Sequence, residues 1–541
     1  MTKRPSCLAV RLTLRLSLTF LFATVFFAAN AQSELLPIGH DLQLKLGRKI
    51  YFDTAGRNHT ALQRYFTKNL STDSVSQDSL LRSLYPERAA WQSKNWLYRK
   101  LFTEHLVEVN TDEYSFYLDF LPDLQVGKQN GNNVWLNTRG VELGARIGEK
   151  FAFTSHFFEN QGKFPDYMSN YINTNRIVPG QGYAKAYGQN RFDYHYSGAT
   201  LSYTPSKYVN FQLGYDKNFI GDGYRSLLLS DNSYNYPFFK ATGTLGRVKY
   251  MAMFAQFIDF QDTPYDESQT PYPKKYGVFH YLSYNVNKRL SLGLFQNVMW
   301  APRGFEFSYF VPLMILRSAE FANGSPDKAL YGINASYKIA DRYVGYSQLM
   351  INEFRVNDIF ANKGHWANKQ GVQLGIKGFD IFKVNNLNAQ LETNMVRPYS
   401  YSSRTHLTNY GHFGQPLAHP YGANFKEYLS IVNYRYKNFD ARLQLTKATY
   451  GLDVDSVSYG KDIYKSYFSR PSDEGVFIGN GLKTNLFYAQ ATLAYILNPK
   501  NNLRIEIGYT HRNESNAQYT DKQQLFNIGL RSSFRNIYND F

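Results

Sequence analysis

Residues 221–226, with the sequence Gly-Asp-Gly-Tyr-Arg-Ser, combine glycines with an acid and a base, as ligand-binding turns often do. The segment begins like a phosphate-binding glycine loop, but the third glycine is missing and no helical pattern follows. We therefore expect the glycines to allow a turn at the end of a strand. Asp222 and Arg225 are predicted to face the lumen as a constriction pair, structural rather than catalytic, and both are also ligand-binding candidates.

A long polar segment, residues 399–422, concentrates histidine and tyrosine, including His406. Three histidines can bind zinc, but their spacing in this segment matches no standard zinc motif. Aromatic faces stack on sugar rings, so an exposed loop of this composition suits carbohydrate. We predict Tyr401, His412 and His419 as ligand-binding candidates. The alternative is that these rings pack the loops together or line a membrane boundary.

Motifs that indicate catalysis are missing from the sequence. There is no H-E-x-x-H motif and no G-x-S-x-G nucleophile elbow, and Ser325 lies in an Asn-Gly-Ser-Pro turn. Carboxylates on polar strand faces could pair as in glycoside hydrolases, but the sequence does not show which of them are close. We predict no catalytic residue, no cofactor and no metal, and keep a lipid or glycan hydrolase as an alternative.

The elements that must position these side chains are strands. From about residue 106 apolar and polar residues alternate, as in 209–216, 387–392, 439–446 and 503–510. In a soluble sandwich the apolar face would be the core. In a membrane barrel the apolar face meets lipid and the polar face lines the lumen. Three features favour the barrel: the export predicted from the N-terminal residues, the strands that end in tyrosine, and the number of alternating segments.

The connections between strands alternate in length. Short polar turns are expected at 204–207, 287–289 and 498–502, and long polar loops at 160–190, 222–236, 261–275, 399–422 and 453–481. Short periplasmic turns and long extracellular loops are typical of outer-membrane barrels, which predicts roughly 16–18 antiparallel transmembrane strands over residues 106–541. The last strand is expected to run from about Phe526 through Phe534.

The first 105 residues differ from the rest. Residues 1–31 have the charged start, apolar run and small-residue cleavage site of a signal peptide. Residues 32–105 are expected to form a periplasmic, partly helical segment. In it, Pro86 suits a first helical turn, and Trp91, Tyr98 and Phe102 fall on one helical face. This segment is expected at the periplasmic entrance, with packing inside the barrel as a plug as the alternative.

The composition agrees with an exported membrane protein. Aromatic residues reach 17%, with 45 tyrosines and 41 phenylalanines, which suits interfacial girdles and a sugar-binding surface. The one cysteine, Cys7, lies in the predicted signal, so disulfides and thiolate sites are excluded. The net charge of +17 is dispersed. It favours lipopolysaccharide or acidic polysaccharide as a partner over nucleic acid.

Residues 219–231, FIGDGYRSLLLSD, resemble the capsule-assembly Wzi family, and within it the gliding-motility RemB-like branch of Bacteroidota. Supporting segments are WAPRG at 300–304, YSQLMINEF at 346–354 and LAHPYGANFKE at 417–427. The likeness covers most of the chain after the predicted signal. It implies an outer-membrane barrel of about eighteen strands with a small periplasmic helical part. It also implies a non-enzymatic role in organising surface polysaccharide or, for the RemB-like branch, in motility.

Our leading hypothesis is an outer-membrane barrel that binds surface polysaccharide for capsule attachment or gliding. Asp222, Arg225, Arg303 and Glu353 are predicted at polar positions of the lumen or rim. The expected partners are outer-membrane lipid, lipopolysaccharide and surface polysaccharide, with motility or surface-export proteins as further candidates. The alternatives are a passive porin, supported by the polar strand face, and the hydrolase mentioned above.

Overall fold

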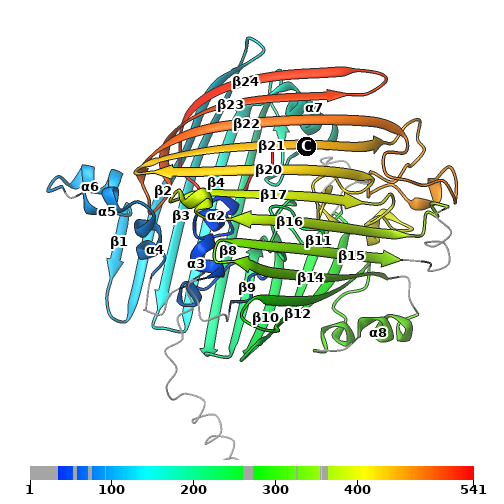
Figure 1. Cartoon of the computed structure of the whole chain (residues 1–541), viewed down its shortest axis with the longest axis horizontal. Coiled ribbons are helices and arrows are strands. Elements are labelled where there is room, and N and C mark those ends of the chain that lie inside the picture. Colours follow the sequence, from blue (N-terminus) through cyan, green and yellow to red (C-terminus); the bar gives the residue numbers. More distant parts are fainter. Residues whose placement is uncertain are drawn as a thin grey trace, which may run out of the picture.

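The computed structural model describes residues 35–541 except 53–57, 71–75, 92, 260–271, 313–314, 325–326, 354 and 356–362. Within this part of the chain, eighteen long strands form one antiparallel sheet that closes where the first strand pairs with the last (Figure 1). The barrel predicted from the alternation is therefore confirmed, with a strand number at the upper end of the expected range. The strands are β2 (Tyr114–Gln129), β3 (Asn132–Ile147), β4 (Phe151–Lys163), β8 (Arg191–Ser206), β9 (Val209–Asp216), β10 (Tyr236–Leu245), β11 (Val248–Ile258), β12 (Lys274–Asn285), β13 (Leu290–Trp300), β14 (Lys328–Ala340), β15 (Tyr343–Glu353), β16 (Lys369–Gly378), β17 (Leu387–Val396), β20 (Phe425–Tyr436), β21 (Phe439–Leu452), β22 (Leu482–Asn498), β23 (Leu503–Ser515) and β24 (Thr520–Arg531).

Shorter elements lie between and before these strands. They are the strands β1 (Val107–Asn110), β5 (Ile177–Val178), β6 (Gly182–Tyr183), β7 (Lys185–Ala186), β18 (Gly411–His412) and β19 (Gln415–Pro416); the α-helices α2 (His40–Lys45), α3 (Gly47–Tyr51), α4 (Gln77–Leu84), α5 (Pro86–Ala90), α6 (Trp96–Phe102), α7 (Asp166–Asn175) and α8 (Leu316–Ala322); and the 3-10 helices η1 (Thr67–Leu70), η2 (Phe307–Phe310), η3 (Ile381–Lys383), η4 (His406–Thr408) and η5 (Tyr467–Ser469). None of the described helices is both long and apolar enough to cross a membrane.

Side-chain exposure shows which face of the sheet points outward. On β23, Ile505 and Ile507 are 46% and 39% exposed, whereas Glu506 between them is 7% exposed. On β9, Leu213 is 61% exposed and the adjacent Gln212 is 4% exposed. The apolar row therefore faces outward and the polar row faces the interior, as a barrel in lipid requires and a soluble sandwich does not allow.

The two ends of the barrel differ in their connections. The predicted short turns join β8 to β9, β12 to β13 and β22 to β23 at one end, here called the short-turn end. The predicted long segments join β9 to β10, β17 to β20 and β21 to β22 at the opposite end, here called the long-loop end. Both groups of connections agree with the predicted asymmetry.

Much of the chain between strands folds into the barrel rather than away from it. Every residue from 217 to 235 is buried, and Leu227, Leu228 and Leu229 form a hydrophobic core with Met251 and Met253 of β11. We call residues 217–235, together with α2, α3, loop 397–424 and tail 532–541, the luminal plug. The expectation of an entirely polar inner face is therefore wrong along β11, because the plug covers that part of the wall.

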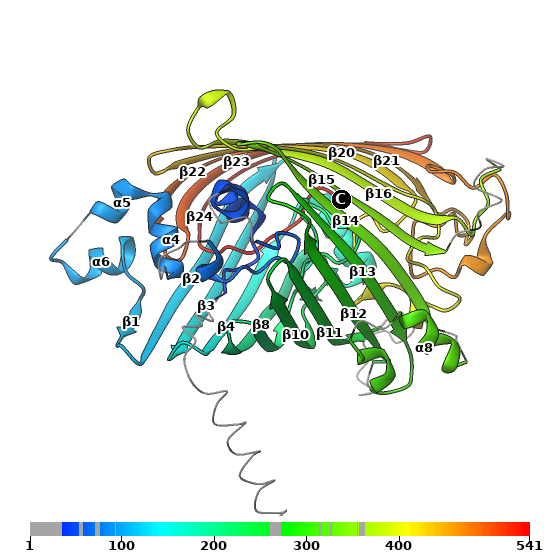
Figure 2. The ribbon, with the colours of Figure 1, turned by 60° about the horizontal axis from the view of Figure 1, so that its bottom comes forward.

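The N-terminal segment divides between the two positions considered for it. Helices α2 and α3 lie inside the barrel (Figure 2). There Tyr51 donates a hydrogen bond to Asp222 at 2.9 Å. Helices α4, α5 and α6 lie at the short-turn end, beside β1 (Figure 1). Pro86 occupies the first turn of α5, as predicted. The predicted single helical face is wrong, because the helix ends at Ala90 and Trp91 lies outside both α5 and α6. The rings of Trp91 and Phe102 still pack, with centroids 5.4 Å apart.

The last strand is shorter than predicted. β24 ends at Arg531, not at Phe534, and residues 532–541 run back through the lumen. There the hydroxyl of Tyr538 donates a hydrogen bond to Asp231 at 2.6 Å. Polar partners inside the barrel therefore hold this tail, which explains why its apolar alternation is lost.

The connection between β13 and β14 covers part of the outer wall, which the sequence did not predict. The carbonyl of Tyr309, in η2, accepts a hydrogen bond from the imidazole of the outward-facing His280 at 2.8 Å. Next to it, Leu316 of α8 packs with Val278 and Val298 of the wall. Phe307 and Phe321, on the opposite side of this covering, are 73% and 64% exposed. The covering therefore hides apolar side chains of the outer wall, and its own exposed phenylalanines form an apolar surface in their place.

Candidate functional site

Arg225 occupies the centre of the luminal plug. Its guanidinium is fully buried and pairs with Glu427 of β20 at 3.1 Å and with Asp540 of the tail at 2.7 Å. The rings of Tyr224 and Tyr538 lie 5.0 and 4.9 Å from it. A buried ion pair of this kind is stable only because its charges are closely matched and hydrogen-bonded. Arg225 therefore joins three parts of the chain inside the lumen.

Asp222 lies in the same network but does not pair with Arg225 as predicted. Its carboxylate accepts hydrogen bonds from the Tyr51 hydroxyl at 2.9 Å and from the Asn334 amide at 3.0 Å. The two charges therefore face different walls of the barrel. The expected turn is present as a bend over residues 221–225, and a Cβ at Gly221, whose φ is +153°, would lie 2.5 Å from Nε2 of Gln348.

The predicted ligand contacts of segment 399–422 are buried, so the exposed loop expected from its composition is wrong for them. Tyr401 donates its hydroxyl to the carbonyl of Leu227 at 2.8 Å and is 0% exposed. His419 contacts Glu427 at 2.7 Å through Nε2. The cause is the plug, whose backbone and carboxylates give these side chains partners inside the lumen.

His412 is held as a neutral imidazole. Its Nδ1 accepts a hydrogen bond from the Ile258 amide at 3.0 Å, and its Nε2 lies 3.0 Å from the carbonyl of Asn235. Burial lowers the pKa of His412 to about 3. His412 and His419 use their ring nitrogens on different protein partners, so the histidines of this loop do not converge on one metal position.

Arg303 and Glu353, the other two predicted contacts, lie at the long-loop end and are partly exposed. Arg303 pairs with Asp327, which also accepts a hydrogen bond from the Tyr309 hydroxyl at 2.5 Å. Glu353 pairs with Lys369 at 2.9 Å. The two residues belong to separate groups, and Glu353 lies in a group of aromatic rings and cations that ends in the exposed Phe468.

The group beside Glu353 combines aromatic rings with cations. Lys369 lies 3.9 Å from the ring centre of Tyr467, and Arg470 lies 4.0 Å from that of Trp366. The rings of Trp366 and Tyr467 are 4.9 Å apart. Phe468 extends the group outward and is 65% exposed. We call Glu353, Trp366, Lys369, Tyr467, Phe468 and Arg470 the rim cluster. Rings and hydrogen-bonding cations in this arrangement suit the apolar faces and oxygens of a sugar.

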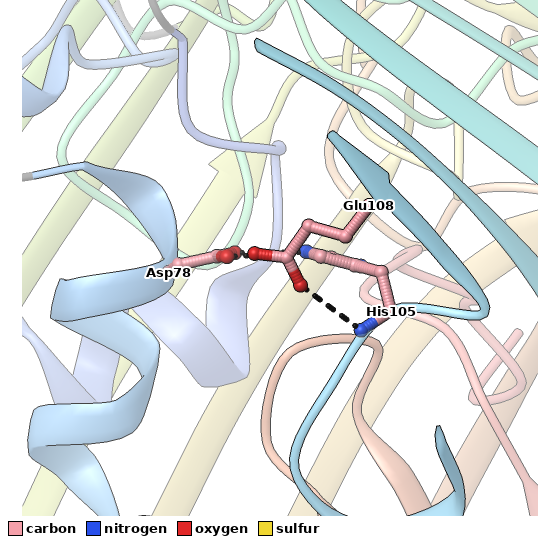
Figure 3. A group of neighbouring side chains, drawn as sticks. All are labelled: Asp78, His105 and Glu108. Carbon is pink, nitrogen blue, oxygen red and sulfur yellow. Dashed lines mark hydrogen bonds and ion pairs between the residues drawn. The ribbon is translucent and has the colours of Figure 1, made fainter. Parts of the chain in front are cut away.

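A second polar group lies at the short-turn end and joins Asp78, His105 and Glu108 (Figure 3). Within the described part of the chain, these are the side chains grouped closely enough to hold a metal ion. However, Nε2 of His105 contacts Asp78 at 3.0 Å and its Nδ1 contacts the buried Asp119. Lys500 contacts Asp78 at 2.8 Å and Glu108 at 2.7 Å, and so supplies the positive charge that a metal would bring. The group is therefore an ion-pair cluster that attaches α4 and β1 to the barrel.

Protonation of His105 makes this attachment depend on pH. Burial alone would lower the pKa of His105, but hydrogen bonds to Asp119 and Asp78 raise it to about 9. A group whose pKa rises on folding stabilises the folded state below its unfolded value of 6.5 and loses that effect as pH rises through about 9. Burial would raise the pKa of Asp78, but His105 and Lys500 hold it at about 2, so its contribution is lost only in strong acid.

We therefore expect the helices α4–α6 to open locally more often above pH 9 while the barrel stays closed. Hydrogen-exchange protection factors for residues 76–105 should be constant between pH 5 and 6.5 and should fall by about tenfold or more near pH 10. In His105→Gln the protection should be low throughout and should not change with pH. An equal pH response in this variant would contradict the assignment.

Comparison with known proteins agrees with the barrel. No protein-family model and no curated protein matches the sequence. Among solved structures, the chain is similar to Wzi, an Escherichia coli outer-membrane protein involved in group 1 capsule assembly and described as a carbohydrate-binding β-barrel. Identity is 14%, the TM-score is 0.54, and the match covers 93% of this chain and 100% of Wzi. The chain is an outer-membrane β-barrel.

Two further structures of outer-membrane barrels match less well. OprD of Pseudomonas aeruginosa is 13% identical with a TM-score of 0.41, over 80% of this chain and 98% of OprD. OccAB2 of Acinetobacter baumannii is 14% identical with a TM-score of 0.40, over 77% of this chain and 98% of OccAB2.

The sequence did not predict most of the rim cluster. Trp366, Tyr467 and Arg470 lie on two loops about a hundred residues apart, and the second loop was identified only as long and polar. The available signal was the sequence Tyr-Phe-Ser-Arg at 467–470, which places two rings and a cation in a loop outside the strands. Which other residues would join them depended on how the loops pack.

Proposed function

We propose that this protein binds surface polysaccharide at its long-loop end and holds it at the outer membrane, without enzymatic activity. The observation that carries the proposal is the rim cluster, in which the exposed ring of Phe468 and the partly exposed Trp366 and Arg470 lie together beside a filled lumen. Short turns face the periplasm and long loops the exterior in outer-membrane barrels, which supports an extracellular position for the rim cluster. Carbohydrate binding by Wzi, the structurally similar barrel, supports the same assignment.

A holding role is favoured over a porin by the luminal plug. Three cavities of the lumen have volumes of about 100, 160 and 130 Å³, and residues of the tail line all three. A channel for solutes would need a continuous opening along the axis. In planar bilayers the purified protein is therefore expected to give no steady conductance, and a large steady conductance would favour the porin instead.

The biological process that uses this binding is either capsule attachment or gliding. Wzi takes part in capsule assembly, whereas the RemB-like sequence segments favour motility. A deletion strain separates the two: loss of surface polysaccharide with normal movement supports capsule attachment, and loss of movement with polysaccharide retained supports gliding. Neither change, together with no glycan binding by the purified protein, would contradict the proposal.

The rim cluster gives a direct test of binding. On an array of acidic and neutral bacterial glycans, Phe468→Ala is expected to weaken binding by about tenfold, because it removes a stacking surface worth about 1.4 kcal/mol. Trp366→Ala is expected to weaken binding as well, because Arg470 and Tyr467 lose the ring that they pack against. Trp96→Ala is the matched control, since Trp96 is 58% exposed but lies at the short-turn end. Equal binding by all three variants would show that the glycan contacts another surface.

A further inference from the structure

Helix α6, at the short-turn end, leaves its apolar side chains uncovered. All seven of its residues are exposed or half-buried. Trp96, Leu97, Tyr98 and Leu101 are 58%, 54%, 50% and 42% exposed, and Trp91, which precedes the helix, is 36% exposed. In both views α6 projects away from the barrel, and no other labelled element lies on its far side (Figure 1 and Figure 2). We call these five residues the α6 patch.

The helix separates apolar from basic side chains. Leu97 and Leu101 are four residues apart and therefore lie on one side of α6. Arg99 and Lys100 point to the other side, where each pairs with Glu104 at 2.9 Å. A helix with an uncovered apolar side and a basic side is typical of segments that lie in a membrane interface.

The backbone of α6 is prepared for a surface that excludes water. At the start of the helix, the side chain of Asn95 accepts hydrogen bonds from the amides of Leu97 and Tyr98 at 2.9 and 3.3 Å. At its other end, the side-chain amide of Asn498, the last residue of β22, donates to the carbonyl of Lys100 at 3.4 Å. Because polar backbone groups without partners cannot enter hydrocarbon, these bonds lower the cost of bringing α6 into lipid.

A chain of contacts connects the α6 patch to the outer surface of the barrel. Tyr495 of β22 lies on the same strand face as Leu493, which points outward and is 44% exposed. Arg88 of α5 donates a hydrogen bond to the Tyr495 hydroxyl at 3.1 Å and lies 5.2 Å from the ring centre of Phe102. The ring of Phe102 is in turn 6.0 Å from that of Tyr98. The patch therefore continues the wall that faces lipid.

The area and the charge of this region favour lipid over a protein partner. Its five side chains, of at most about 250 Å² each and about half exposed, offer no more than about 600 Å². One partner of a stable protein interface contributes about 800 Å². Residues 91–104 contain three bases and one acid, which suits the negative phosphates of lipid headgroups. Tryptophan and tyrosine are also the side chains enriched where membrane meets water.

We propose that the α6 patch inserts into the periplasmic leaflet of the outer membrane. Its rings and leucines lie at the boundary between headgroups and acyl chains, and the neighbouring bases contact lipid phosphate. Helices α4–α6 are thus attached to the membrane as well as to the barrel. The short-turn end faces the periplasm in outer-membrane barrels, so this contact lies opposite the rim cluster and does not depend on polysaccharide binding.

Spin labels on single cysteines test the position of α6 in the purified protein, with Cys7→Ser removing the one native cysteine. The membrane is a nanodisc of phosphatidylethanolamine and phosphatidylglycerol that holds one barrel. Labels at Leu97→Cys and Leu101→Cys should be several times more accessible to oxygen, which concentrates in hydrocarbon, than to a water-soluble nickel chelate. Leu213→Cys on the outward wall calibrates lipid, and Lys288→Cys in an exposed short turn calibrates water.

Either of two other results would overturn the proposal. Labels on α6 that behave like the label at position 288 would place the patch in water. Labels shielded from both reagents would show that protein covers it. Heat-modifiable migration on gels shows which labelled variants form the closed barrel, so a variant that fails to fold is recognised before it is measured.

Tryptophan fluorescence gives a second measurement without a label on the helix. Acyl chains brominated near the headgroup should quench the unaltered protein, and the double variant of Trp91→Phe and Trp96→Phe should show a smaller quenched fraction. The matched control is Trp366→Phe, which removes a tryptophan of the rim cluster and should not reduce that fraction. An equal quenched fraction in the folded double variant and in the unaltered protein would also overturn the proposal.

Discussion

Arg225→Met is expected to lower the free energy of unfolding by about 3–5 kcal/mol, because it leaves two carboxylates buried without their cation. Glu427 and Asp540 are 0% and 1% exposed, so neither can recover hydration in the folded barrel. The substitution also removes the link between the plug, the wall and the tail. Urea titration of the purified protein, followed by tryptophan fluorescence, measures the change.

Two further variants show whether unpaired charge is the cause. Adding Glu427→Gln to Arg225→Met removes one of the stranded carboxylates, so the double variant should be more stable than Arg225→Met alone. Lys363→Met is the control: it breaks an exposed ion pair with Glu474, whose atoms are 3.7 Å apart, and should cost less than about 1 kcal/mol. A double variant that is less stable than the single variant would contradict this explanation.

The barrel was predictable where one strand face meets lipid and the other meets polar groups. Ile505, Glu506 and Ile507 alternate because their environments alternate, and this local rule requires no knowledge of the partner strands. The rule fails along β11. There Met251 and Met253 pack against the plug, while Phe254 on the outer face packs against Phe305 of the outer covering. Both faces are covered by protein, so neither needs polar side chains.

The site was less predictable, because its chemistry depends on contacts between distant segments. Arg225, Glu427 and Asp540 were visible as charges, but nothing local shows that the tail returns through the lumen. His419 and Tyr401 have the composition of an exposed sugar-binding loop, yet the same polar atoms can be satisfied by the backbone and carboxylates of the plug. Composition therefore indicated which groups could form hydrogen bonds, while packing decided which of them remain accessible.

Removing the centre of the plug is expected to have the largest effect on function. Asp216 and Tyr236 are directly paired across β9 and β10, so the strands are already close enough for a short turn. Replacing residues 219–233 with a short Gly-Ser linker should therefore preserve the hairpin while emptying the lumen beside β11. Planar-bilayer recordings should then show steady conductance, where the unaltered protein is expected to be silent.

The design of this deletion separates an opened lumen from a damaged barrel. Heat-modifiable gel migration must first show that the shortened protein still closes. As a control, residues 471–475, which are exposed in the loop between β21 and β22, can be replaced by the same linker, and that variant should stay silent. Conductance in the control alone would show that this outer loop, and not residues 219–233, keeps ions out of the lumen. A closed, silent barrel after removal of 219–233 would mean that α2, α3, loop 397–424 and the tail are enough to close the lumen. Residues 219–233 would then stabilise the wall through Leu227–Leu229 and would not be needed to keep the barrel impermeable.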